Sequence, residues 1–240
     1  MKLIINADDF GISKSITEGI IEGIIDGYIT STSIMANMEY AEYAINEAIK
    51  NNIKCIGLHI NLTVGKPIIE NKNLTDENGV FLYNKKQIDN PKLTYDDAYN
   101  EIIAQIEIVE KYSQGKIKID HLDTHHSLCD NANIEHAIID IASKYKLPIR
   151  KMFDSELVMP DVLYKDFTIK NVCIEEMQRM IDKYKKEDVI IELMTHPGYI
   201  DEYTETITSY LGREKELRIL KEAKDSKLFE GIELISYSQM

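Results

Sequence analysis

Near its start the chain reads Ile4-Ile5-Asn6-Ala7-Asp8-Asp9-Phe10-Gly11, an apolar run that stops at two adjacent carboxylates and a glycine. This pattern is typical of a buried strand that ends in a polar crevice. Each of two adjacent carboxylates raises the cost of ionising the other unless a cation or a hydrogen-bond donor lies between them. A divalent metal would remove that conflict, with one aspartate as a ligand and its neighbour facing the reacting water as a base. A simple Asp-Asp turn closed by glycine is the alternative.

The composition of the chain limits the classes of function. It has 240 residues, of which 44% are hydrophobic and 29% are charged, as expected for a soluble globular protein with an ample core. The formal net charge of −13 leaves no basic surplus to neutralise phosphates. We therefore expect neither a nucleic-acid partner nor an anionic membrane partner, and we interpret the acidic surface as an aid to solubility.

The cysteines and the N-terminal residues indicate the compartment. Cys55, Cys129 and Cys173 lie far apart without a Cys-x-x-Cys spacing, which indicates neither a zinc ribbon nor a disulfide framework. Free thiols fit a reducing cytosol. Asp8 interrupts the first apolar run before a signal-peptide core could form, and no apolar stretch is long enough to span a bilayer. We therefore expect a cytoplasmic protein.

Helical and extended patterns alternate along the rest of the chain. Ser15 and Glu18 have the spacing of a capping box, and isoleucines at helical spacing follow until Gly27. Further helices are predicted at 39–51, 95–112, 134–145, 174–185 and 213–224. Strands are predicted at 30–37, 53–62, 116–126, 148–153, 189–195 and 231–237, with an irregular stretch at 154–172. Residues 63–92 show neither pattern and are predicted to be a functional loop that covers the substrate.

This alternation predicts one α/β domain over residues 1–240 with about seven parallel strands. An open doubly wound sheet and a closed or nearly closed (β/α) barrel both fit it. We prefer the barrel, because its strand ends converge on one mouth. Polar residues fall at the ends of four different strands: Asp8, Asp9, His59, His125 and His196. The first strand is not followed by Gly-x-Gly-x-x-Gly, so nothing supports a dinucleotide site.

The segment His121-Leu122-Asp123-Thr124-His125-His126 is the densest cluster of polar chemistry in the chain. On a strand, His121, Asp123 and His125 would share one face and His126 would point the other way. Together with Asp9 and His59, His125 would complete a ligand set for one divalent ion with open positions for water and substrate. His196 precedes Pro197-Gly198 and is either functional or part of a turn that ends the strand.

Four motifs, in order along the chain, resemble those of the YdjC-like carbohydrate deacetylase family, which includes chitooligosaccharide deacetylases. They are Asn6-Ala7-Asp8-Asp9-Phe10-Gly11, Gly57-Leu58-His59-Ile60-Asn61-Leu62, the 121–126 segment and Glu192-Leu193-Met194-Thr195-His196-Pro197-Gly198. The resemblance extends to the region of Arg213, and so covers nearly the whole chain. It implies a distorted (β/α) barrel, similar to the polysaccharide deacetylases, that holds one metal ion.

The resemblance also implies roles for individual residues. Asp9, His59 and His125 would be the metal ligands, Asp8 the general base and His196 the general acid. Residues that orient the ligands or bind substrate would be Asp123, His121, His126 and Arg213. One departure is that Thr124-His125-His126 is followed by Ser127-Leu128, where family members commonly have a third histidine. The ligand position His125 is kept, and the departure concerns the shape of the sugar subsite.

The implied reaction is the metal-dependent hydrolysis of an N-acetyl group on a sugar, for instance on chitobiose or its phosphate, with release of acetate. The resemblance indicates Mg²⁺ first, whereas two imidazoles favour Zn²⁺ or another transition metal. It also implies a small carbohydrate as partner and a possible homodimer. Two alternatives stay open. A non-catalytic metal-dependent carbohydrate binder leaves the second aspartate unexplained, and a non-haem iron oxygenase, to which His121-x-Asp123 with His196 would also fit, is usually an all-β protein.

Overall fold

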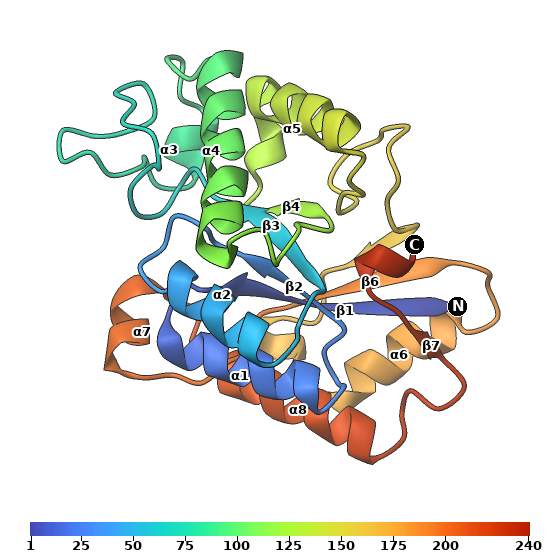
Figure 1. Cartoon of the computed structure of the whole chain (residues 1–240). Coiled ribbons are helices and arrows are strands. Elements are labelled where there is room, and N and C mark those ends of the chain that lie inside the picture. The colour runs from blue at the N-terminus through green and yellow to red at the C-terminus, as the bar shows by residue number, and fades with distance from the viewer.

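One parallel sheet curls through the centre of the protein, which we describe from a computed structural model (Figure 1). The structure describes residues 1–240, except for the side chain of Ile169. The strands lie in the order β4-β3-β2-β1-β6-β5, with β7 beside β1, and every pairing is parallel. Their bounds are β1 (Lys2–Phe10), β2 (Ser31–Ile34), β3 (Ile56–Ile60), β4 (Leu122–Thr124), β5 (Val162–Tyr164), β6 (Ile190–Thr195) and β7 (Glu233–Leu234). Within the described residues no pairing joins β4 to β5, so the predicted barrel is an incomplete one.

An arc of helices surrounds this sheet. In Figure 1, α1, α6 and α8 lie below the sheet, and α4 and α5 lie above β3 and β4. Successive members of the arc contact each other in the order α6, α8, α1, α2, α4 and α5. The bounds are α1 (Lys14–Ile25), α2 (Ala41–Lys50), α3 (Lys85–Ile88), α4 (Tyr95–Ser113), α5 (Ala132–Tyr145), α6 (Ile174–Tyr184), α7 (Glu202–Ile207) and α8 (Arg213–Asp225).

Strand β1 has one face toward the helices and one toward the interior of the half-barrel. Leu3, Ile5 and Ala7 belong to the large apolar core under the helices. Ile4 packs instead in a separate cluster with Tyr237, in the short helical turn η3 (Tyr237–Gln239). The period of two along a strand therefore puts Asn6 and Asp8 on the interior side with Ile4.

The first helix starts earlier than the sequence indicates. Its N-cap is Ser13, whose backbone is extended and whose side-chain oxygen accepts a hydrogen bond from the N–H of Ile16 at 3.1 Å. The predicted capping box at Ser15 and Glu18 is wrong, because Ser15 lies inside α1. The Ser15 hydroxyl instead contacts that of Thr204 in α7 at 2.8 Å.

The region between β4 and β6 also differs from the prediction. The expected strand at 148–153 is reduced to one bridge between Ile149 and Leu122. A strand, β5, lies instead in the stretch that was expected to be irregular, where it pairs with β6 at the edge of the sheet. Its residues are only half-buried, so they lack the apolar pattern by which buried strands are recognised.

The long segment 63–92 is a folded loop that contains α3 and a bridge between Thr75 and Phe81. The three cysteines are free, as expected from their spacing. Among the described residues, no helix is both long enough and apolar enough to cross a bilayer.

Candidate active site

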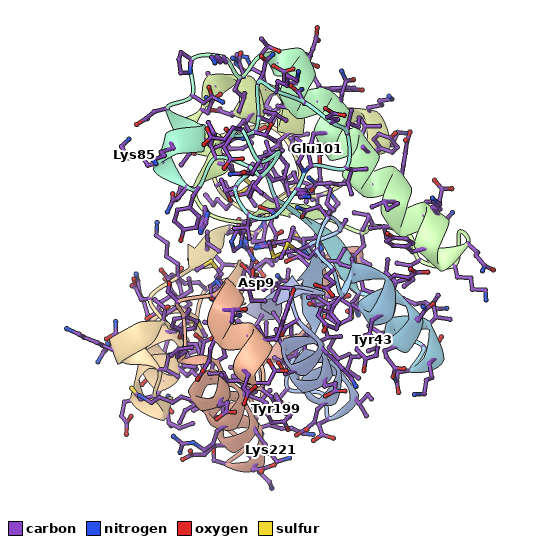
Figure 2. The ribbon with its side chains drawn as sticks, turned by 90° about the vertical axis from the view of Figure 1, so that its left-hand side faces the viewer. Asp9, Tyr43, Lys85, Glu101, Tyr199 and Lys221 are labelled. Atoms are coloured by element: carbon purple, nitrogen blue, oxygen red, sulfur yellow. The ribbon has the colours of Figure 1, made fainter. Side chains whose placement is uncertain are left out.

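The carboxyl ends of the strands form a mouth on one side of the sheet. Figure 2 looks onto it, and Asp9 lies midway between α3, marked by Lys85, and α8, marked by Lys221. The side chains predicted at strand ends come to this mouth from β1, from β3 and from the residues that follow β4 and β6. They are Asp8, Asp9, His59, His125 and His196.

A break in strand geometry brings two neighbouring aspartates into the same mouth. In a regular strand, Asp8 and Asp9 would point to opposite faces. Asp9 instead has a φ of 69°, and the register of β1 against β2 shifts between Ala7 and Phe10. Residues other than glycine seldom adopt this left-handed conformation, and such residues cluster at functional sites. Both carboxylates therefore reach the site while remaining almost fully buried.

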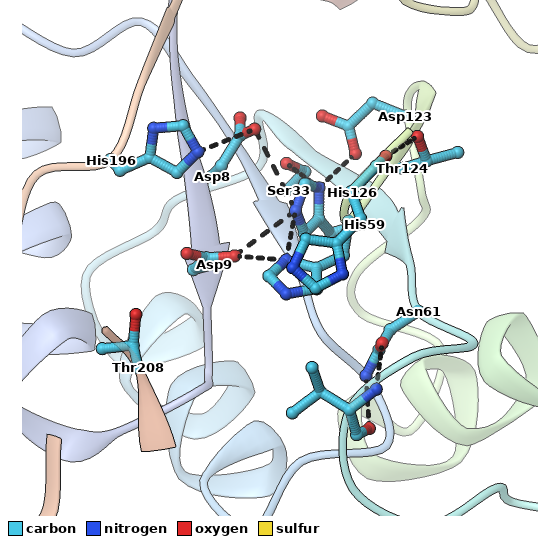
Figure 3. Close-up of polar contacts among 12 residues, drawn as sticks. Asp8, Asp9, Ser33, His59, Asn61, Asp123, Thr124, His126, His196 and Thr208 are labelled. Atoms are coloured by element: carbon cyan, nitrogen blue, oxygen red, sulfur yellow. Dashed lines mark hydrogen bonds and ion pairs between the residues drawn. The ribbon is translucent and has the colours of Figure 1, made fainter. Parts of the chain in front are cut away.

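Asp9, His59 and His125 form a compact group, which we call the metal-ligand group. Asp9 Oδ1 lies 3.4 Å from His59 Nε2 (Figure 3). The same oxygen lies 3.0 Å from His125 Nδ1, and the two nitrogens are 3.3 Å apart. One carboxylate and two imidazoles whose ligand atoms face each other fit a divalent ion. The other oxygen of Asp9 accepts a hydrogen bond from Arg213 Nη2 at 2.6 Å. Burial raises the pKa of Asp9, but Arg213 and His125 outweigh it and hold that pKa well below its usual range.

Asp123 fixes the orientation of His59 from behind. Asp123 Oδ1 lies 2.7 Å from His59 Nδ1, and because a carboxylate only accepts, Nδ1 carries the hydrogen. His59 Nε2 therefore faces Asp9, which is how a carboxylate orients a metal-bound imidazole. Burial lowers the pKa of His59, but Asp123 and Asp8 outweigh it and raise that pKa to about 10. These carboxylates favour a positive charge at Nε2, which a proton or a metal ion can supply.

Asp8 is held by a buried arginine that sequence reasoning missed. Arg150 donates from Nη1 and Nη2 to the two oxygens of Asp8 at 2.8 and 2.6 Å. Arg150 also lies 2.9 Å from Asp123 Oδ2 and donates from Nε to Glu192 Oε1 at 2.8 Å. Burial opposes the charge of Arg150, but these three carboxylates raise its pKa well above its ordinary value. Tyr237 donates to the remaining oxygen of Glu192 at 2.5 Å.

The available signal for this network was a charged residue within an apolar stretch. Glu192 interrupts the apolar run of β6, and Arg150 lies inside the stretch 148–153, for which the sequence predicts a strand. Charges at such positions are rarely buried unless they are paired. The sequence gives no sign, however, that these two charges meet each other and Asp8.

His196 lies beside Asp8, outside the metal-ligand group. Its Nε2 is 3.8 Å from Asp8 Oδ2 (Figure 3), and its backbone N–H donates to Glu216 in α8. The side chain is 24% exposed, so the imidazole is accessible from the mouth. Its ring also meets Tyr210 edge to face, with centroids 5.7 Å apart.

His126 does not point away from the site as predicted. Strand β4 ends at Thr124, and His126 has a φ of 62°, so the alternation of a strand does not extend to it. Its ring lies beside His125, with centroids 4.1 Å apart, and its Nδ1 is 2.9 Å from the hydroxyl of Thr63. His126 therefore belongs to the wall of the mouth.

His121 lies away from the mouth, in the interior of the half-barrel. It is fully buried, donates from Nδ1 to Asp120 at 2.7 Å, and stacks on Tyr237 with centroids 3.8 Å apart. A substrate in the mouth cannot contact it. Its Nε2 lies 3.9 Å from Asp123 Oδ2, so His121 supports the interior beside the carboxylate that orients His59.

Two cavities open at the mouth. The larger, about 380 Å³, lies on the side of Asp8, and the smaller, about 230 Å³, lies on the side of Asp9. Three residues line both cavities: His125, His126 and His196. A ligand bound at the metal-ligand group therefore has room to extend in two directions.

Comparisons with known proteins agree with the chemistry of this site. The family model described as YdjC-like protein matches residues 2–230. A carbohydrate deacetylase of Listeria monocytogenes serotype 4b is 34% identical over 251 residues, covering all of both chains. One of Vibrio cholerae is 32% identical over 246 residues, covering all of this chain and 96% of the other.

Solved structures show the same architecture. A protein of Enterococcus faecalis V583 with a proposed role in cellobiose-phosphate cleavage has a TM-score of 0.88 at 30% identity, covering 99% of this chain and 98% of its own. A peptidoglycan N-acetylglucosamine deacetylase has a TM-score of 0.56 at 12% identity, covering 100% of this chain and 87% of its own. The second likeness concerns the fold, which is that of the polysaccharide deacetylases.

Proposed function

This chain belongs to the YdjC-like protein family, and on that premise we propose that it is a metal-dependent carbohydrate deacetylase. It would hydrolyse the N-acetyl group of sugars that contain N-acetylglucosamine and release acetate. One observation carries the proposal: Asp9, His59 and His125 form a metal-ligand group with Asp8 and His196 beside it. This set occurs in a chain that is similar over its full length to proteins named carbohydrate deacetylases.

Asp9, His59 and His125 would hold one divalent ion. Their ligand atoms lie within 4.8 Å of one another, and Asp123 orients one of the two imidazoles, as is usual around a metal ligand. When bound, such an ion lowers the pKa of a water and polarises a carbonyl. The family resemblance favours Mg²⁺, whereas the imidazoles favour Zn²⁺ or another transition ion.

Asp8 and His196 would handle the protons of the reaction. Arg150 binds both oxygens of Asp8 and holds this carboxylate at the edge of the metal-ligand group, where it can accept a proton from an attacking water. His196, 3.8 Å away from Asp8, is accessible from the mouth and can donate a proton to the leaving amine. Arg213 and Asp123 support the ligands Asp9 and His59 by direct hydrogen bonds.

Two features favour an enzyme over a metal-dependent binder of carbohydrates. A binder needs no second carboxylate beside the ligand Asp9, yet the left-handed backbone at Asp9 lets both neighbouring carboxylates reach the mouth. A buried arginine then holds Asp8 with two hydrogen bonds. The oxygenase alternative has no support, since the chain belongs to the YdjC-like family and His121 of its triad is buried away from the mouth.

The test is acetate release from N-acetylglucosamine and from N,N′-diacetylchitobiose, each with and without a 6-phosphate. We expect acetate with added divalent metal, none with chelator, and at least a hundredfold loss in His125→Ala, since a metal ligand is removed. His136→Ala is the matched control, because His136 is an exposed histidine on α5. Absence of acetate from every sugar in protein with a bound metal would favour the binder.

A further inference from the structure

We propose that the smaller cavity binds a second sugar ring, joined to the one that carries the acetamide, and that Tyr83 is the surface on which this ring stacks. The inference rests on the proposed function, because it names a subsite of the same active site. The cavity is lined by Asp9, His125 and His196 and also by Tyr83. A ring held there would therefore adjoin a ring whose acetamide lies at the metal-ligand group.

Tyr83 presents an aromatic ring to this cavity. It is 60% exposed although it belongs to the cavity wall, and its ring meets that of His126 edge to face, with centroids 5.4 Å apart. A ligand that covered this ring would bury a large apolar surface. A pyranose suits the ring, since its axial C–H groups form an apolar face that packs flat against an aromatic side chain.

The rest of the wall offers hydroxyl groups without a free charge. Thr168, Thr208 and Ser209 line the cavity, and Figure 3 shows Thr208 on the side of Asp9 that faces away from Asp8. The charge of Arg213, also in the wall, is already matched by Asp9 at 2.6 Å. Hydroxyls that line the same cavity as an aromatic ring suit a neutral polyhydroxylated ligand, because a few polar groups in a largely apolar pocket fix the orientation of the ligand.

The loop holds Tyr83 in place before any ligand binds. Two residues earlier, Phe81 is buried in the core, and its backbone N–H donates to the carbonyl of Gly65 at 2.9 Å. Four residues later, Gln87 is fully buried and donates to the carbonyl of Leu62 at 2.8 Å. A ring carried by backbone that is anchored on both sides binds a ligand with less loss of conformational entropy than a ring on a mobile loop.

The experiment compares the wild type, Tyr83→Ala and Tyr83→Phe on N-acetylglucosamine and on N,N′-diacetylchitobiose. We expect Tyr83→Ala to raise KM for the disaccharide about tenfold, the effect of losing one aromatic contact, while kcat changes less than about twofold. The monosaccharide should be affected less than about twofold, since it does not reach the cavity. Tyr83→Phe keeps the ring and should behave as wild type. Tyr145→Ala is the control for loss of an exposed tyrosine elsewhere.

The affinity of the Zn²⁺-loaded protein for the disaccharide, measured by calorimetry, separates this proposal from the function on which it rests. If the wild type binds the disaccharide about tenfold more tightly than Tyr83→Ala but releases no acetate, the subsite is supported and the proposed reaction is wrong. If acetate is released and Tyr83→Ala changes KM equally for both sugars, or for neither, the proposed subsite is wrong and the proposed reaction stands. If the wild type neither binds the disaccharide nor releases acetate, both are wrong.

Discussion

Two aspartates, Asp123 and Asp120, each pair with a buried histidine, but only one of these histidines, His59, faces the mouth. Asp123 receives His59 Nδ1 at 2.7 Å, and Asp120 receives His121 Nδ1 at the same distance. We predict that Asp123→Asn weakens the binding of Zn²⁺ about 10- to 100-fold, because the charge that orients His59 is lost. Isothermal titration calorimetry on the metal-free protein measures it.

Asp120→Asn is the matched control for that prediction. It removes the same negative charge from beside a histidine that lies outside the metal-ligand group, so Zn²⁺ affinity should stay within about threefold of wild type. Equal losses in Asp120→Asn and Asp123→Asn would contradict the role of Asp123, since they would then reflect a general loosening of the interior. A general loosening of the interior should also lower the free energy of unfolding of both variants.

At the scale of elements, the sequence predicts those with a strong period. The apolar stripes of α2, α4, α5, α6 and α8 gave helices close to their observed bounds, and the apolar runs of β1, β3 and β6 gave strands. The edge strand β5 has half-buried residues, and the short helices α3 and α7 are held by tertiary contacts, so neither carries a period that can be read. Local pattern fails where a neighbour, and not the segment itself, determines the conformation.

In the loop 63–92, tertiary contacts hold the short helix α3 in place. Gln87 in α3 donates from one side-chain nitrogen to the carbonyls of Leu62 and Leu74, at 2.8 and 3.0 Å. We predict that Gln87→Ala lowers the free energy of unfolding by about 1–3 kcal/mol, because it leaves buried carbonyls without a donor. Urea denaturation measures this. Lys86→Ala, at the exposed neighbouring position, should change it by less than about 0.5 kcal/mol. Similar losses in the two variants would mean that α3 is not held through Gln87.

At the scale of the molecule, the polar residues at strand ends predicted the mouth, but the interior behind it could not be predicted. Parallel strands bring Asp9, His59 and His125 together, so their positions along the chain were sufficient. Asp8 and Arg150, by contrast, are 142 residues apart in a contact that depends on how far the sheet curls. Contacts inside a half-barrel have no local period, so no pattern in the sequence marks them.

That interior contains a contact that links η3 to the first strand of the sheet. Tyr237 donates to Glu192, which binds Arg150, which in turn holds Asp8 of β1. We predict that Tyr237→Phe lowers the free energy of unfolding by about 1–3 kcal/mol, since it leaves one buried oxygen of Glu192 without a donor. The stacking on His121 is kept, so the loss reports the hydroxyl group.

A double-mutant cycle in urea identifies the partner of that hydroxyl. If Tyr237 acts through Glu192, then Tyr237→Phe in a Glu192→Gln background should cost less than in wild type, by about 0.5–3 kcal/mol. Tyr145→Phe, on the surface, should cost under about 0.5 kcal/mol in both backgrounds. If Tyr237→Phe lowers the free energy of unfolding equally in both backgrounds, the hydroxyl stabilises the fold independently of Glu192. The geometry instead makes Glu192 the link by which η3 supports the arginine that holds Asp8 in the mouth.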